Sequence, residues 1–259
     1  MPLVETEGGS IVTLTLNRPE SRNALSIEMC DSIVDALASL ETRSDVRVVI
    51  LRGRGNVFCS GADLAAVSGP GAASFLAAFE RMLEAVAHHP VPTIACVQGA
   101  ALGGGLQLAT VCDFRIGAHD AKIGIPSTRL GIVVNFENVE RLVLLAGIAV
   151  AKEVLMTARV FSGVEAERAG LLTRCASEGE LDSVTNELAE RIARAAPLSV
   201  RGAKRAIEVV VDRLGAGRSR DPEAVAGVDD LVAEAYASDD LQEGLRAMGE
   251  KRAPRFSGR

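Results

Sequence analysis

The sequence predicts an α/β fold in which alternating strands and helices are followed by a largely helical C-terminal region. Two observations carry this prediction. Up to about residue 141, short runs of β-branched and aliphatic residues alternate with amphipathic segments. Beyond that point, segments with helical spacing follow one another with only short turns between them. Aromatic residues make up 3% of the chain and tryptophan is absent, so Ala, Val, Leu and Ile must build the core.

Four strands are predicted in the first part. The segment 11–16 (IVTLTL) alternates β-branched residues with Leu and Thr, as a half-buried strand does. The segment 46–51 (VRVVIL) is more apolar, which is typical of a strand covered on both faces. Two further strands are expected at 91–97, where Pro92 stands near the start, and at 114–117.

Helices are expected to connect these strands. Ser26 is a good N-cap for an amphipathic helix that runs to about Leu40. A second helix is predicted from about Ser74 to Ala87, and a third from Leu106 to Thr110, after the glycine run 103–105. In the C-terminal part, the predicted helices are 141–157, 164–170, 180–195, 197–213, 221–237 and 239–251.

Composition limits the possible functions. A chain of 259 residues with 48% apolar and 24% charged residues suits one large domain, or one domain with a small appendage. A net charge of −6 argues against general nucleic-acid binding. The five cysteines are scattered without CxxC spacing and only three histidines exist, so no metal site is expected.

The sequence also indicates where the protein works. Dispersed cysteines suit a reducing compartment. The first nine residues do not resemble a signal peptide, and no run of 18 apolar residues predicts a membrane span. We therefore expect a cytoplasmic protein. The last nine residues carry four basic side chains and no acid, which indicates either a solvated tail or a local site for an anionic ligand.

Two glycine-containing segments carry most of the functional information. Residues 60–63 (SGAD) and 103–106 (GGGL) each lie where a strand gives way to a turn or helix. Glycine lets the backbone approach a ligand closely, and a helix N-terminus leaves N–H groups free. Two such N–H groups that converge on one point would bind an oxyanion. Either segment alone is also compatible with an ordinary turn.

Other nucleotide and nucleophile motifs are absent or incomplete. Neither glycine segment matches the GxxxxGK[ST] phosphate loop or the GxGxxG dinucleotide pattern. A serine hydrolase would need Ser60 or Ser127 as nucleophile and His88, His89 or His119 as base. No GxSxG elbow supports that alternative.

Several motifs in a fixed order give the chain a family resemblance. These motifs are LNRPESRNALS (16–26), FCSGADL (58–64), VQGAALGGGLQLA (97–109), CDFRIG (112–117), IPSTRLGI (125–132), AGL (169–171) and EKRAPRFSGR (250–259). Through them, the chain resembles the crotonase (enoyl-CoA hydratase/isomerase) superfamily over nearly its whole length. The resemblance implies a ββα spiral core over 1–195, a helical trimerisation region over 196–259, and assembly as trimers or dimers of trimers.

The resemblance also implies a substrate and a site. In this family, a thioester carbonyl lies between two backbone N–H groups, which the motif match assigns to Ala62 and Gly104. They would stabilise an enolate. In comparable acyl chemistry, removal of one such donor raises the activation free energy by about 3–4 kcal/mol. Coenzyme A enters as part of the substrate, and no other cofactor is implied. The implied substrate-binding residues are Arg22, Ala24, Ser60, Ala62, Asp63, Leu64, Gly104, Gln107, Ser127, Asn135 and Lys251.

The sequence departs from the family pattern at the acid–base positions. Family hydratases use two glutamates, and these positions are Gln107 and Ser127 here. Efficient hydration is therefore not expected, since water must lose a proton while the α-carbon gains one. Some family isomerases carry a carboxylate where this chain has Asn135. Glu137 is the nearest acid, and it either serves as the base or decorates the start of a helix.

Two functions remain open at this point. The first is an enoyl-CoA hydratase/isomerase-like enzyme that favours isomerisation, which needs only one base. The second is a non-catalytic acyl-CoA carrier or scaffold in fatty-acid metabolism, which Gln107 and Ser127 favour directly. The segment 133–136 is mainly apolar, as a site for an acyl chain requires. The family's usual aromatic residue near the basic tail is Met248, which predicts weaker packing against adenine.

Overall fold

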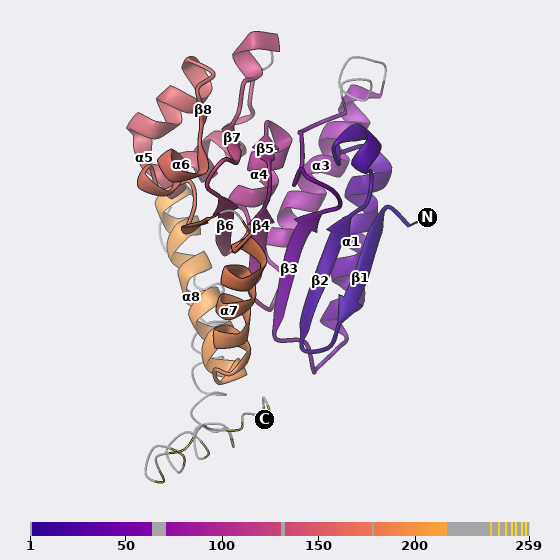
Figure 1. Ribbon diagram of the computed structural model, residues 1–259, viewed down its shortest axis with the longest axis vertical. Helices are drawn as coiled ribbons and strands as arrows, with labels where there is room; N and C mark the ends of the chain where they lie inside the picture. Colours follow the sequence, from indigo (N-terminus) through magenta and orange to yellow (C-terminus); the bar gives the residue numbers. More distant parts are fainter. Residues whose placement is uncertain are drawn as a thin grey trace.

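The computed structural model is an α/β fold, as the sequence predicts (Figure 1). It describes residues 2–63, 71–130, 133–177 and 179–216, together with residues 239, 243, 247, 250, 252, 255, 257 and 259. The predicted helices 221–237 and 239–251 therefore fall almost entirely outside the described residues.

The main sheet has six strands in the order β1-β2-β3-β4-β6-β9. β1 runs antiparallel to β2, and the other neighbours are parallel. All four predicted strands are present, although β3 and β4 each begin two residues later than the predicted segments 46–51 and 91–97. The strands are β1 (Val4–Gly8), β2 (Ile11–Leu16), β3 (Val48–Gly53), β4 (Thr93–Val97), β6 (Phe114–Ala118) and β9 (Arg174–Ala176).

A second, three-stranded sheet has the order β5-β7-β8. β5 (Ala100–Leu102) starts three residues after the end of β4, so the chain passes directly from the first sheet into the second. β5 pairs in parallel with β7 (Lys122–Gly124), which pairs antiparallel with β8 (Val160–Phe161). The region after residue 141, for which only helices were predicted, also contains the short strands β8 and β9.

The described helices lie at the predicted positions, and their ends differ from the predictions by at most three residues except at the start of α5. Ser26 caps α1, because its side chain accepts a hydrogen bond from the Met29 N–H at 3.2 Å. α5 begins at Phe136, five residues before the prediction, and is kinked at Gly147. The helices are α1 (Ile27–Glu41), α3 (Ala72–Ala87), α4 (Gly104–Thr110), α5 (Phe136–Met156), α6 (Gly163–Arg168), α7 (Leu181–Ala193) and α8 (Pro197–Ala216), with short 3-10 helices η1 (Pro19–Ser21) and η2 (Ser127–Leu130).

Helices bury both faces of the central strands, which explains the continuous apolar character of β3. Val49 and Leu51 belong to a large core cluster that also contains residues of α1 and α3. Val48 and Ile50 belong to a second cluster, against which α7 packs. Alternate side chains of one strand therefore serve two cores.

Among the described residues, no helix is both long and apolar enough to cross a membrane. No group of three or more His, Cys, Asp or Glu side chains there could hold a metal ion. All five cysteines are free thiols.

Candidate functional site

The candidate site lies where β3 and β4 end, and backbone pairing builds it. The chain that follows β3 pairs with β5: the Cys59 N–H donates to the Ala100 carbonyl at 3.0 Å, and the Leu102 N–H donates to the Cys59 carbonyl at 3.1 Å. This parallel bridge aligns Cys59 with Ala101. Ala62 and Gly104 each stand three residues after these partners, so the pairing brings the two glycine-containing bends together.

The backbone nitrogen atoms of Ala62 and Gly104 lie close together. A Cβ atom built on Gly104 would lie 3.4 Å from the Ala62 nitrogen, and one built on Gly61 would lie 3.4 Å from the Gly104 nitrogen. Gly103 caps α4 with φ 53° and ψ −122°, a conformation open to glycine. Within the described ranges, neither the Ala62 N–H nor the Gly104 N–H donates a hydrogen bond.

The loop between β2 and α1 is hydrogen-bonded to the first bend. The Leu25 N–H donates to the Gly61 carbonyl, and the Asp63 N–H donates to the Leu25 carbonyl, both at 2.8 Å. The Ser60 N–H donates to the Arg22 carbonyl at 3.0 Å. The structure thus brings together Arg22, Ala24, Ser60, Ala62 and Asp63. Two further residues implied by the resemblance, Leu64 and Lys251, lie outside the described residues.

Two residues that hold this loop were not singled out from the sequence. Asn23 is fully buried; its Oδ1 accepts from the Arg18 N–H at 3.0 Å and its Nδ2 donates to the Val57 carbonyl at 2.7 Å. The Arg18 guanidinium donates to the Ala24 carbonyl at 3.0 Å and pairs with Asp63 at 3.3 Å. Both lie inside the matching stretch 16–26, but only the fold shows what they contact.

Gln107 and Ser127 stand where the family resemblance implies glutamates. Their side chains are neutral, and they lie on elements joined to the start of α4. Gln107 is half-buried one turn after Gly104. Ser127 follows β7, whose Gly124 carbonyl accepts from the Gly103 N–H at 2.9 Å. Neither side chain makes a hydrogen bond to another described residue.

An apolar wall stands beside the second bend. The Phe79 ring would lie 3.2 Å from a Cβ atom on Gly104, and it stacks on Phe75 with ring centroids 5.7 Å apart. Both rings are buried. A ligand carbonyl held at the bend would therefore have an apolar neighbour on the α3 side.

The structure gives Asn135 and Glu137 different surroundings. Glu137 is exposed in the first turn of α5. Asn135 donates to the Glu80 carboxylate of α3 at 2.9 Å, and Asn138 donates to the same oxygen at 2.7 Å. Arg141 binds the other oxygen at 3.3 Å. Glu80 is thus an acid at this end of α5 that sequence reasoning missed, since it lies 55 residues from Asn135 in the chain.

The serine-hydrolase alternative finds no support in this geometry. The Ser60 hydroxyl donates to the Ser21 carbonyl at 3.4 Å. In the part of the chain that the structure describes, no histidine hydrogen-bonds to Ser60 or Ser127. Burial raises the pKa of the Cys59 thiol to about 12, so this neighbouring cysteine is protonated at neutral pH and is not an activated nucleophile.

The comparisons with known proteins decide the family. The model of the enoyl-CoA hydratase/isomerase family matches residues 6–259. The chain belongs to this family. Among its relatives, a putative enoyl-CoA hydratase of Thermus thermophilus is 37% identical, with 98% of this chain and 100% of that protein covered. The peroxisomal Delta(3,5)-Delta(2,4)-dienoyl-CoA isomerase of Arabidopsis thaliana is 35% identical, with 96% and 93% covered.

A solved structure supports the same conclusion for the fold. The enoyl-CoA hydratase/carnithine racemase of Magnetospirillum magneticum matches with a TM-score of 0.91 and 30% identity, over 100% of this chain and 97% of that one. This member of the enoyl-CoA hydratase/isomerase family therefore has the crotonase fold. The family acts on acyl-CoA thioesters, which sets the substrate class within which a function can be proposed.

Proposed function

We propose that this chain binds acyl-CoA thioesters and stabilises their enolate form through the N–H groups of Ala62 and Gly104. The observation that supports this most is the close approach of the two nitrogen atoms, with no hydrogen-bond acceptor for either N–H among the described residues. Fixed donors at a half-buried site favour negative charge on the thioester oxygen. Arg22, Ala24, Asp63 and their neighbours would then hold the coenzyme A part of the substrate.

Isomerisation of a double bond suits this site better than hydration. In a 3-enoyl thioester, a base removes a proton from Cα, the electrons spread to the thioester oxygen and Cγ, and the same base returns the proton at Cγ. One base is enough. Glu137 is the base that we propose, and the amide of Gln107 and the hydroxyl of Ser127 would contact the acyl part without exchanging protons.

The second candidate function is a non-catalytic acyl-CoA carrier. Gln107 and Ser127, both neutral and half-buried, support it. A carrier would use the same N–H groups to hold the thioester oxygen and would not need any base. The two functions therefore share a binding mode and differ only in turnover.

One set of assays separates the two functions. The purified protein is incubated with a 3-enoyl-CoA and with crotonyl-CoA, and the products are separated by chromatography. We expect conversion of the 3-enoyl to the 2-enoyl thioester without hydration of crotonyl-CoA. Glu137→Gln should lower turnover about 100-fold, the usual contribution of a general base. Glu187→Gln, at an exposed ion pair on α7, is the matched control.

Each other outcome has a defined meaning. Acyl-CoA binding without turnover of either substrate identifies a carrier. Turnover that survives Glu137→Gln but is lost in Glu80→Gln would identify Glu80 of α3 as the base. Measurable hydration contradicts the argument from the missing glutamates, and release of free thiol from a saturated acyl-CoA would support a hydrolase. Failure to bind any acyl-CoA contradicts the proposal itself.

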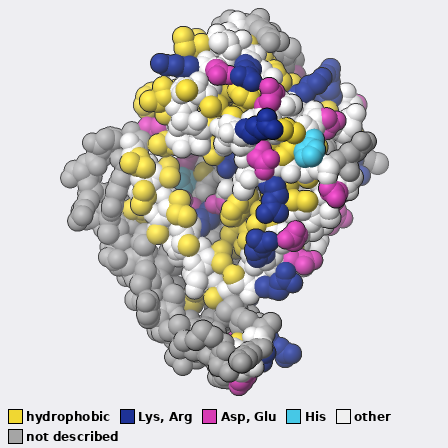
Figure 2. Space-filling view, turned by 60° about the vertical axis from the view of Figure 1, so that its left-hand side comes forward, with side chains coloured by type: hydrophobic (Ala, Val, Ile, Leu, Met, Phe, Trp, Pro, Cys, Tyr) yellow, Lys and Arg dark blue, Asp and Glu magenta, His cyan; other side chains and the backbone are white. Residues whose placement is uncertain are grey.

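We also propose that the chain forms a homotrimer or a dimer of trimers, with 196–259 as the trimerisation region. Apolar side chains remain exposed on α5 and α8; Figure 2 brings this side of the molecule forward. Burial of such side chains between copies would stabilise an assembly. Light scattering should report three or six copies, and a monomer would contradict the proposal. The exposed residues are Leu144, Ile148, Met156, Ile207, Val210, Val211 and Leu214.

The proposed compartment is the cytoplasm. Five free thiols, of which four are buried, suit a reducing environment. Relatives in mitochondria and peroxisomes show that the family also works in other compartments.

A further inference from the structure

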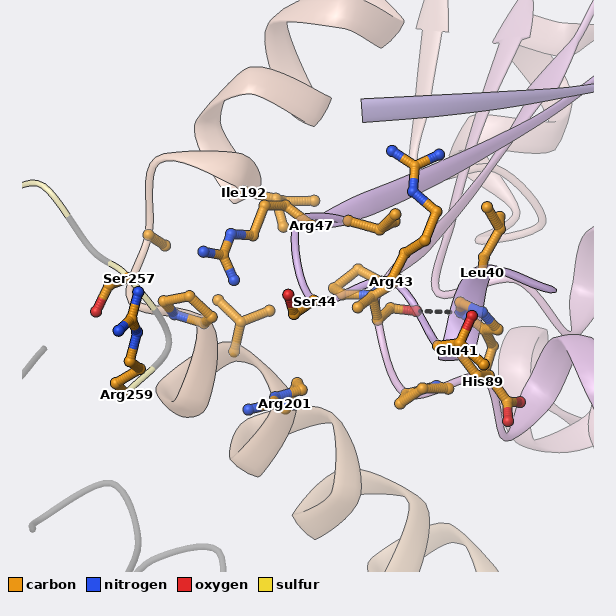
Figure 3. A pocket seen from close by; sticks show the side chains of 18 residues that line it. Leu40, Glu41, Arg43, Ser44, Arg47, His89, Ile192, Arg201, Ser257 and Arg259 are labelled. Atoms are coloured by element: carbon orange, nitrogen blue, oxygen red, sulfur yellow. Dashed lines mark hydrogen bonds between the residues drawn. The ribbon is translucent and has the colours of Figure 1, made fainter. Parts of the chain in front are cut away.

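A cavity lies at the edge of the main sheet opposite the candidate site. Its volume is about 330 Å³, and residues that precede β3 and β4 line it, among them Arg47 and Pro92 (Figure 3). The Ala62 and Gly104 bends follow the ends of the same two parallel strands. The cavity is therefore separated from the acyl-CoA site by the length of the strands.

Arginine side chains from three parts of the chain line this cavity. Arg43 and Arg47 come from the connection between α1 and β3, Arg201 comes from α8, and Arg259 comes from the far end of the sequence (Figure 3). Among the described residues that line it, Glu41 has the only acidic side chain. The cavity is thus strongly basic in a chain whose net charge is −6.

Most of this positive charge is not neutralised by ion pairs. Arg43 is paired with Asp45 at 2.7 Å. Arg47, Arg201 and Arg259 form no ion pair with any described residue. The Nε atom of Arg201 is also buried without a hydrogen-bond partner in the described part of the chain. A buried donor without an acceptor is costly, and an anionic ligand would supply that acceptor.

The amino end of α8 adds a second source of positive potential. This helix of 20 residues begins at Pro197, and Pro197, Val200 and Arg201 all line the cavity. Helix N-termini carry partial positive charge and bind phosphate groups well. His89 also lines the cavity. Burial lowers the pKa of its imidazole, so the ring adds no positive charge to that of the arginines.

Apolar residues complete the lining. Val46, Pro92, Ile192 and Val200 stand among the arginines. A volume of about 330 Å³ is at the small end of the range for ligand pockets. A ligand that matches both the arginines and the small apolar lining has a doubly charged head group and a small apolar body.

We propose that this cavity binds the phosphate group of a small phosphorylated molecule, with Arg47 and Arg201 as its main ligands. Guanidinium groups match phosphate oxygens in geometry and charge. A monocarboxylate would neutralise only one of the two arginines. The site is independent of the Ala62 and Gly104 bends and does not depend on the function proposed for them.

Calorimetric titration of the full chain with phenyl phosphate tests this inference. Saturable binding is expected, weakening as salt is added, and benzoate should bind more weakly because it carries one charge. Arg47→Gln and Arg201→Gln should each weaken binding about tenfold, as expected for the loss of a charge-assisted hydrogen bond. Arg191→Gln, at an exposed ion pair with Glu187 on α7, makes the same charge change and should not alter binding.

The contrary results are equally specific. An absence of saturable phenyl phosphate binding at low salt overturns the inference. Equal weakening in Arg191→Gln would mean that net charge alone attracts the anion. If Arg201→Gln lowers the melting temperature strongly, Arg47→Gln decides the matter, because Arg47 stands in a surface connection. Binding that coenzyme A displaces, and that Gly104→Pro abolishes, would place the phosphate at the acyl-CoA site instead.

Discussion

Gly104→Pro is expected to abolish the recognition and turnover of acyl-CoA thioesters while the protein remains folded. Proline removes the N–H and places its ring where that hydrogen points. Gly104 is the first residue of α4, a position at which helices accept proline, and the glycine before it is conformationally permissive. The loss of one such donor should lower turnover about 100- to 1,000-fold. Far-UV circular dichroism and a thermal melt would establish that the variant is folded.

Gly104→Ala is the matched comparison, because it keeps the N–H. Its Cβ would lie 3.2 Å from the Phe79 ring and 3.4 Å from the Ala62 nitrogen, so the ring must shift slightly. We expect a partial loss of binding, clearly smaller than that in Gly104→Pro. Equal affinity for acyl-CoA in wild type and in a folded Gly104→Pro variant would exclude this N–H as a ligand of the thioester oxygen.

Gly105→Ala should destabilise the whole fold. Its Cβ would overlap the Cys59 carbonyl oxygen and lie 2.9 Å from the Cys59 Cβ. That carbonyl accepts from the Leu102 N–H, so it cannot move without breaking the pairing between the bend and β5. Overpacking of a core usually costs about 1–3 kcal/mol, and a collision with fixed backbone belongs at or above the top of that range. Urea unfolding measures the loss.

Gly202→Ala provides the control for Gly105→Ala. Gly202 lies inside α8, and a Cβ there would have no atom within 4 Å. Alanine in a helix interior should raise the free energy of unfolding by about 0.5–1 kcal/mol. Equal midpoints for wild type and Gly105→Ala would show that the two segments are not packed as tightly as the structure indicates.

Local pattern was enough to predict the elements that are long or strongly apolar. β2, β3, β4 and β6 appear as expected, because continuous or alternating apolar residues reflect burial in the sheet. β1 was missed: its residues are half-buried or exposed at a sheet edge, so no apolar pattern marks them. β9 has three residues, too few for any period to be detected. The kink at Gly147 also has no signal beyond a single glycine.

The backbone part of the candidate site could be predicted from the sequence, but the side-chain contacts around it could not. Glycine-containing bends after two strands indicated free N–H groups, and motif order assigned them to Ala62 and Gly104. The surroundings of Asn135 were not predictable, because its partner Glu80 belongs to α3, 55 residues away in the chain. Such contacts depend on tertiary structure, which local periodicity does not encode.

The parallel pairing of Cys59 with Ala101 has a practical consequence for inhibitor design. The N–H groups that we propose as ligands of the thioester oxygen belong to the main chain, so exchange of side chains would leave them in place. A thioester mimic with a permanently charged oxygen would consequently bind many relatives alike. We expect inhibitor selectivity to depend on the side chains of Gln107, Ser127 and Asn135, which stand where the family resemblance implies carboxylates.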